Sequence, residues 1–190
     1  AAGPSPQAPL AGHRLADANQ GADTTDSDGA LVGTSAVAAL TTGGPGANDH
    51  TYDFGFVPLP PPEPAIDIEK WSVLDGFPAG DFDDSPGKEL TTGVPEALAM
   101  TITNTGNEPL VDVVVSDVTG AGPAVEGWSC DFSALGGPSS GLTWAGPFQP
   151  GDSFGCLGAL PGLDVDTTHS DLASVVAVGE TSDEEVSDDD

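Results

Sequence analysis

Residues 96–117 read EALAMTITNTGNEPLVDVVVSD, and this stretch decides the fold. From Leu98 to Ile102 every second side chain is large and apolar, and from Val111 to Val115 every second residue is a valine on one face of an extended chain. A period of two is typical of a β-strand that buries one face. The stretch therefore predicts two such strands in succession.

The segment between these strands is rich in turn-forming residues. Asn104, Gly106 and Asn107 tolerate positive φ angles, which lets a short connection form without strain. We therefore expect the two strands to be joined in a short hairpin.

The same strand pattern recurs through the second half of the chain. Turn signals separate short apolar runs about every 8–15 residues, a spacing typical of an all-β sandwich, and no segment has a convincing helical stripe of apolar residues. We expect seven antiparallel elements, the sixth composed of two loosely paired runs: Ala65–Val73, Glu89–Thr92, Glu96–Asn104, Leu110–Asp117, Glu126–Phe132, Leu142–Ala145 with Ser153–Leu160, and Leu172–Val178.

The first part of the chain has a different composition. After a loop-like start, β-like runs are expected at Ala30–Val32, Ser35–Leu40 and Thr51–Val57, the last with Tyr52 and Phe54 in phase on one face. Residues 58–64 are rich in proline, which favours the extended polyproline II conformation, and we place a domain boundary there.

The charge of the chain is strongly negative. Its 190 residues contain 31 Asp and Glu but only 3 Lys and Arg, a net charge of −28. Nucleic acids and anionic lipids attract basic surfaces, so these partners are excluded. No run of apolar residues is long enough for membrane insertion. Because the chain begins with Ala1 rather than Met, we interpret it as a piece of a longer protein.

The first part of the chain resembles a known bacterial module. Residues 23–29 (DTTDSDG), the apolar run to Leu40, and residues 48–56 (NDHTYDFGF) are similar to the closing half of the B-type domain of serine-aspartate-repeat surface proteins. The resemblance covers about residues 1–57 and implies a partial B-type β domain.

The second part resembles the Ig-like repeat of bacterial adhesin stalks. Four motifs carry this resemblance, in the order of that family: residues 80–87 (GDFDDSPG), 103–115 (TNTGNEPLVDVVV), 150–156 (PGDSFGC) and 172–175 (LASV). It implies an extracellular, Ig-like antiparallel β-sandwich over residues 65–179 that acts as a spacer or presentation module. The acidic residues 180–190 then form a connector, which is expected to be disordered unless a cation folds it.

The two cysteines are expected to form a disulfide bond. Cys130 and Cys156 are the only cysteines of a chain that is secreted by resemblance, and the second one lies in a motif that resembles the family. Closing this loop would contribute about 3 kcal/mol in the chain-entropy model. Two buried free thiols are the alternative. A zinc site is disfavoured because the chain has no CxxC motif.

Two clusters of carboxylates are candidate Ca²⁺ sites. Asp23, Asp26 and Asp28 precede Gly29 at the short spacing that a calcium loop uses, although the full EF-hand pattern is missing. The second cluster lies in a loop rich in glycine and proline and comprises Asp75, Asp81, Asp83 and Asp84. Alternatively, all of these acids are simply solvated.

Other patterns point less clearly to chemistry. The run Gly151–Gly155 matches G-x-S-x-G, but no helix is expected after it, as a nucleophile elbow requires. Lys70 and Asn104 could in principle join in an amide bond beside a carboxylate, although no partner pattern supports this. The tryptophans Trp71, Trp128 and Trp144 are expected in the core, with an exposed carbohydrate platform as the alternative.

Taken together, these observations predict a non-enzymatic structural or adhesion stalk module that is located outside the cell, with Ca²⁺ as its expected stabilising ion. Its partners would be neighbouring domains of the same parent chain. A module that binds a glycan or protein ligand and an acidic ion- or mineral-binding matrix protein are the alternatives.

Overall fold

A computed structural model describes residues 12–18, 20, 27–33, 35–41, 43–48, 52–76 and 87–190. The chain forms two compact units, unit 1 (Ala1–Pro61) and unit 2 (Pro62–Asp190). The division between them falls inside the proline-rich segment 58–64.

The described part of unit 1 consists of two small antiparallel sheets. Strand β1 (His13–Leu15) pairs with β4 (Phe56–Pro58), and β2 (Ala30–Val32) pairs with β3 (Ser35–Val37). The hydroxyl of Ser27 is buried and accepts hydrogen bonds from the backbone N–H groups of Gly29 and Gly55. Most large apolar side chains described in this unit remain exposed, so few of them contribute to a shared core.

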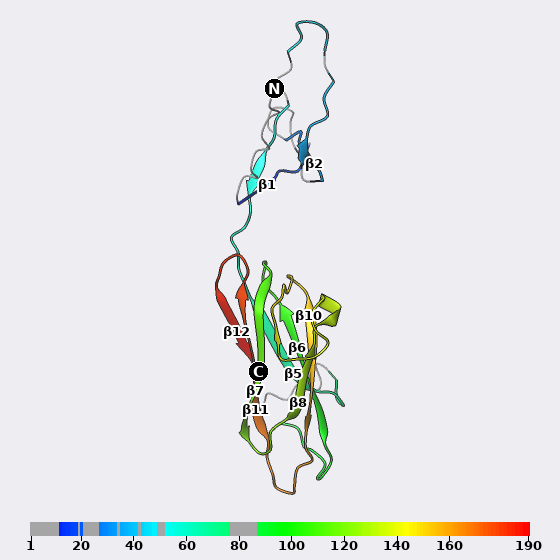
Figure 1. Ribbon diagram of the computed structural model, residues 1–190, viewed down its shortest axis with the longest axis vertical. Helices are drawn as coiled ribbons and strands as arrows, with labels where there is room; N and C mark the ends of the chain where they lie inside the picture. The colour runs from blue at the N-terminus through cyan, green and yellow to red at the C-terminus, as the bar shows by residue number, and fades with distance from the viewer. Residues whose placement is uncertain are drawn as a thin grey trace. The chain divides into compact units, whose positions relative to one another are not determined.

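Unit 2 is a sandwich of two antiparallel four-stranded sheets (Figure 1). Sheet I has the order β5 (Ile66–Ser72), β6 (Glu96–Asn104), β10 (Ser153–Leu160), β8 (Glu126–Asp131). Sheet II has the order β12 (Glu185–Asp189), β11 (Ser170–Gly179), β7 (Leu110–Ala121), β9 (Thr143–Trp144), and a short 3₁₀ turn, η1 (Ser133–Leu135), follows β8. The predicted all-β sandwich is confirmed.

The core of unit 2 lies between the two sheets. Met100 and Ile102 of β6 face Val113 and Val115 of β7, in the phase that the sequence predicted for these four residues, and all four are at least 97% buried. An aromatic cluster fills the rest of this layer, with ring centroids 4.6 to 6.0 Å apart: Phe132, Trp144, Phe148 and Phe154. Such tilted aromatic pairs add stability beyond their burial alone.

The predicted hairpin between residues 104 and 110 is wrong. Strands β6 and β7 belong to different sheets, so the connection crosses from one sheet to the other. The buried Asn104 amide donates hydrogen bonds to the carbonyls of Glu108 and Phe148, and its oxygen accepts one from the N–H of Gly106. The asparagine therefore satisfies backbone groups of the crossing connection, and it does not adopt a positive φ.

A bulge changes the phase of β7 near its start. Asp112 has a φ of 52°, and the pairing of β11 with β7 shifts register between Val176 and Val178. As a result Leu110 and Val113 are both fully buried, whereas Val111, which was predicted to share the buried face, is only partly buried. An extra residue in one strand moves the side chains before it to the opposite face.

Three more predicted elements differ in the structure. The strand expected over residues 51–57 is shortened to β4, because residues 52–55 form no strand. Residues 89–92 form no strand, and the run around Trp144 pairs as β9 with β7 rather than with β10. The hydrogen bond from the Val115 N–H to the carbonyl of Leu142 holds this run against sheet II.

The acidic end of the chain forms a strand where the sequence predicted a disordered connector. β12 pairs with β11, and its carboxylates accept hydrogen bonds from the edge strand of the other sheet: Asp188 from the Ile68 N–H, at 3.0 Å, and Asp190 from the Lys70 N–H. The physical reason is that edge strands expose unpaired amides, which carboxylates can satisfy.

Glu108 fixes the turn that leads into β12. Its carboxylate accepts hydrogen bonds from the Thr181 and Ser182 N–H groups and from the Ser182 hydroxyl, at 2.6 to 3.1 Å. Burial would raise the pKa of Glu108, but these hydrogen bonds outweigh burial and lower it below the usual 4.5. Glu108 therefore stabilises the fold fully above pH 4.5, and this contribution is lost as the pH falls through its lowered pKa.

We expect Glu108→Gln to lower the melting temperature at pH 7, because the amide is a weaker acceptor for these three donors. The difference from the unaltered chain should shrink below pH 4.5, where Glu108 itself becomes protonated. Thermal unfolding followed by circular dichroism between pH 7 and pH 3 measures this. Glu184→Gln, an exposed acid of the same turn, is the matched control. If Glu108→Gln lowered the melting temperature by the same amount at every pH, the stabilising role of the ionised Glu108 carboxylate would be contradicted.

Candidate functional site

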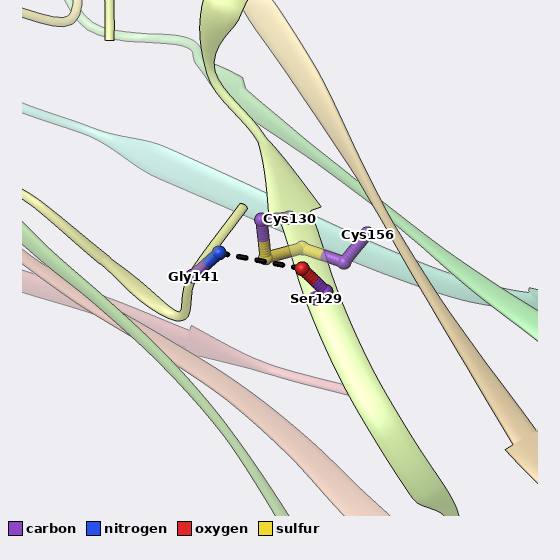
Figure 2. The surroundings of a disulfide bond; sticks show 4 residues. All are labelled: Ser129, Cys130, Gly141 and Cys156. Atoms are coloured by element: carbon purple, nitrogen blue, oxygen red, sulfur yellow. Dashed lines mark hydrogen bonds between the residues drawn. A yellow bond between two sulfur atoms is a disulfide. The ribbon is translucent and has the colours of Figure 1, made fainter. Parts of the chain in front are cut away.

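The two cysteines are joined, as the sequence predicted. Cys130 of β8 and Cys156 of β10 are direct neighbours across sheet I, with their sulfur atoms 1.92 Å apart (Figure 2). The loop after β8 folds back on the same place, since the Gly141 N–H donates to the Ser129 hydroxyl and the Gly141 carbonyl accepts from the Cys130 N–H. The disulfide thus ties the edge strand β8 to the interior of sheet I, and it does not link the two sheets.

A group of buried charges lies between the two sheets, and the sequence interpretation missed it. Lys70 of β5 points into the sandwich, and its Nζ lies 2.5 Å from Oδ1 of Asp171 on β11 and 3.6 Å from Oδ1 of Asp117 on β7. His169 Nε2 lies 3.1 Å from the other Asp171 oxygen. These four residues are called the lysine site below. Only 5 to 14% of each of the four side chains is exposed.

The alternation of the strands explains why these residues face inward. Lys70 is in phase with Ile66 and Ile68, which are buried, and Asp171 is in phase with the buried Ala173 and Val175. Asp117 follows Val113 and Val115 in the same way. The sequence therefore did contain a sign of this site, namely charged residues at inward positions of strands. The strand pattern alone could not show that the three residues meet.

The two carboxyl groups of the lysine site differ in acidity. Burial and the negative charge of Asp171 raise the pKa of Asp117, and Trp128 and Lys70 offset this only in part. Burial also acts to raise the pKa of Asp171, but its hydrogen bond with Lys70 and the charges of Lys70 and His169 outweigh burial and lower it. The site thus favours one ionised carboxylate paired with the lysine and one carboxyl that keeps its proton more readily.

The lysine site is incompletely hydrogen-bonded. Oδ1 of Asp117, Oδ2 of Asp171 and the indole nitrogen of Trp128 are buried without a hydrogen bond of regular geometry. Trp128 reaches this position by packing over Gly158 of β10, where an added Cβ would lie 2.6 Å from the indole ring. Unpaired buried polar atoms are costly, so they often mark a place where the protein does chemistry or binds something.

The second lysine of unit 2 lies in a similar cluster nearby. Lys88 Nζ lies 2.5 Å from Glu96 and also pairs with Asp75, and its hydrogen bond to the Ser72 hydroxyl is 2.8 Å long. The hydrogen bond from Lys88 lowers the pKa of Asp75. Burial acts to lower the pKa of Lys88, but its hydrogen bonds to Asp75 and Glu96 outweigh burial and raise it. Both lysine clusters line one cavity of about 950 Å³, which also contacts residues 163–172.

The predicted Ca²⁺ ligands are only partly described. Asp23, Asp26, Asp81, Asp83 and Asp84 lie outside the described residues. The Asp28 carboxylate accepts a hydrogen bond from the Asp53 N–H, and Asp75 is paired with Lys88. Within the described ranges no group of three or more His, Cys, Asp or Glu side chains is arranged to hold a metal ion. Calcium binding stays a prediction.

The other sequence motifs are placed clearly. Ser153, the central residue of the G-x-S-x-G run, begins strand β10, and its hydroxyl forms a hydrogen bond with the Thr103 hydroxyl. This run therefore forms no turn into a helix. In the pairing of β5 with β6, Lys70 lies opposite Met100, and Asn104 lies opposite Ile66. Lys70 and Asn104 are therefore not neighbours across these strands. Trp144 is buried and Trp128 packs against the core, as predicted. Trp71 is only partly buried and belongs to neither core cluster, so its predicted core position is wrong.

The fold thus defines an all-β sandwich protein with one disulfide bond and a buried lysine site. Comparisons with protein families, curated proteins and solved structures find no match for this chain. Across the described part of the chain, no helix has the length and apolar character needed to cross a membrane.

Calcium should stabilise the chain, because each bound divalent ion offsets two of its negative charges and binds the folded state. We expect the melting temperature to be higher in millimolar Ca²⁺ than in EDTA at matched ionic strength. Isothermal titration should find one or two sites. Equal melting curves would exclude the calcium sites, and many weak sites would favour the acidic matrix protein instead.

Proposed function

We propose that this chain is a non-enzymatic structural module of an extracellular bacterial surface protein, in which unit 2 is an Ig-like spacer. Unit 1 would be part of a B-type domain, and the partners would be neighbouring modules of the same parent chain. The proposal rests on the resemblance of the sequence and on the direction in which the chain passes through unit 2.

The path of the chain suits a spacer. Ile68 of β5 contacts Asp188 of β12, and two residues further along both strands Lys70 contacts Asp190. The residue numbers rise together, so β12 runs in the same direction as β5. The chain therefore enters unit 2 at one end of the sandwich and, at Asp190, is directed toward the other end (Figure 1). Modules with this path can be joined in a row without the chain turning back.

Tension along such a row would shear the outer strands rather than unzip them. β5 and β12 are edge strands of different sheets, and each is bonded along its length to an interior strand, β6 or β11. Shearing must break many hydrogen bonds together. The disulfide bond between β8 and β10 also fits an oxidising environment outside the cell.

The spacer role is tested by pulling the full chain through handles at its two ends in an optical trap. We expect unit 2 to keep its length at forces of a few piconewtons, because its terminal strands are loaded in shear. Extension of unit 2 by unfolding in this range would exclude a load-bearing spacer. An unrelated small domain of known mechanical stability, placed in the same handles, is the control.

One observation favours a binding role for unit 1 as a second candidate. Tyr52, Phe54 and Phe56 occupy alternate positions, and each is 38 to 45% exposed. Exposed aromatic side chains of this kind can stack on sugar rings or pack against a partner protein.

We expect binding to an immobilised glycan or protein ligand to fall at least tenfold in the Tyr52→Ala/Phe56→Ala variant, because each change removes contact area. Glycan-array and surface-binding assays measure it. Val114→Ala/Leu157→Ala, which removes exposed apolar side chains of unit 2, is the matched control. Equal binding by all three proteins would exclude the aromatic surface.

A further inference from the structure

The lysine site brings together an amine and a carboxyl group that are far apart in the sequence. Lys70 and Asp171 are 101 residues apart, yet Nζ lies 2.5 Å from Oδ1. Since a carbon–oxygen bond of a carboxyl group is about 1.2 Å long, Nζ lies no more than about 3.7 Å from the carboxyl carbon. This is close to the separation of about 3–3.5 Å from which a held nucleophile attacks.

The surroundings favour reaction over a simple ion pair. Both side chains are more than four-fifths buried, and two buried charges carry a desolvation cost that a neutral amide would not have. A fixed pair of reactants also gains a large effective concentration, which removes much of the entropic barrier to forming a bond.

Asp117 supplies the third group that such a reaction needs. Its side chain is 95% buried, its Oδ1 lies 3.6 Å from Lys70 Nζ, and this oxygen has no regular hydrogen bond. Burial and the charge of Asp171 raise the pKa of Asp117, so this carboxyl group takes up a proton more readily than an exposed aspartate does. A carboxyl group placed in this way can pass protons between an attacking nitrogen and a departing oxygen.

From this geometry we propose that Lys70 and Asp171 form an intramolecular amide bond, with Asp117 acting as the proton relay. The bond would form whether or not the module is a spacer. It would join β5 of sheet I to β11 of sheet II, whereas the disulfide bond links strands of one sheet only.

The reaction balances without any further reactant. Lys70 first passes one proton to the Asp171 carboxylate, which leaves an amine and a carboxylic acid. The amine lone pair attacks Cγ of Asp171 and forms the carbon–nitrogen bond. Asp117 donates its proton to the departing hydroxyl, which leaves as water when the carbon–oxygen bond breaks, and takes one proton back from the nitrogen. No atom is oxidised or reduced.

His169 is a positioning residue in this scheme. Its Nε2 lies 3.1 Å from Oδ2 of Asp171, on the oxygen that Lys70 does not contact. Contact with the imidazole limits rotation of the carboxyl group while Lys70 approaches, although neither ring nitrogen makes a hydrogen bond of regular geometry. The neighbouring cavity, which both Lys70 and Asp171 line, gives the released water a way out.

Mass spectrometry of the purified full chain tests the proposal. We expect the intact mass to be lower by one water molecule than the mass of the chain with its disulfide bond. Trypsin can cut only after Arg14, Lys70 and Lys88. After denaturation and reduction we expect no cleavage after Lys70, because its amine is blocked, and a branched product in which residues 15–88 are joined to residues 89–190.

Variants assign the roles. Lys70→Arg keeps the positive charge but removes the nucleophilic amine, so the mass should equal that of the unreacted chain and the branched product should disappear. Asp117→Asn keeps the shape but removes the transferable proton, and we expect at least a tenfold slower loss of water. Lys88→Arg, at the other lysine of unit 2, is the matched control and should react as the unaltered chain does.

Two results would overturn the proposal. One is a folded, oxidised chain of full mass that releases separate fragments 15–70, 71–88 and 89–190. The other is loss of water without the branched product, as happens when an Asp-Gly sequence such as Asp28–Gly29 or Asp75–Gly76 closes into a succinimide. A wild-type rate in Asp117→Asn would remove Asp117 from the mechanism.

Discussion

The two sheets of unit 2 share one apolar layer, and every strand must place alternate side chains in it. This requirement fixes the phase of β6 and β7, whose inward residues Met100 and Val113 are almost completely buried. It also forces the bulge at Asp112, because only an extra residue brings Leu110 and Val113 to the same face. The aromatic cluster around Phe132 fills the layer that the shorter strands leave open.

The same requirement places charges at positions that are largely buried. Lys70, Asp117 and Asp171 occupy inward positions of three strands. They meet because β5 of sheet I faces β7 and β11, which are neighbours in sheet II. A buried ion pair of this kind adds little stability over apolar packing, so its presence calls for another explanation. The proposed amide bond is such an explanation, because an amine held against a carboxyl group can react with it. The bond would replace a buried ion pair with a covalent link between the sheets.

The acidic composition has two structural uses in unit 2. Glu108, Asp188 and Asp190 bond backbone amides that would otherwise stay unpaired at a turn and at a sheet edge. The two lysines of unit 2 are both held in carboxylate clusters facing one cavity. The local pairing of charge, rather than the net charge, therefore decides where this part of the chain is ordered.

The sequence by itself determined the all-β class, the positions of most strands and the two cysteines. Strands 96–104 and 153–160 were predicted to the residue, because a period of two is a local property of a strand. Only the tertiary structure decided that residues 104–110 cross between sheets, that the acidic tail pairs as β12, and that Lys70 meets Asp171. The physical reason is that period and turn chemistry depend on neighbours in the chain, whereas pairing and the meeting of distant charges depend on which faces pack together.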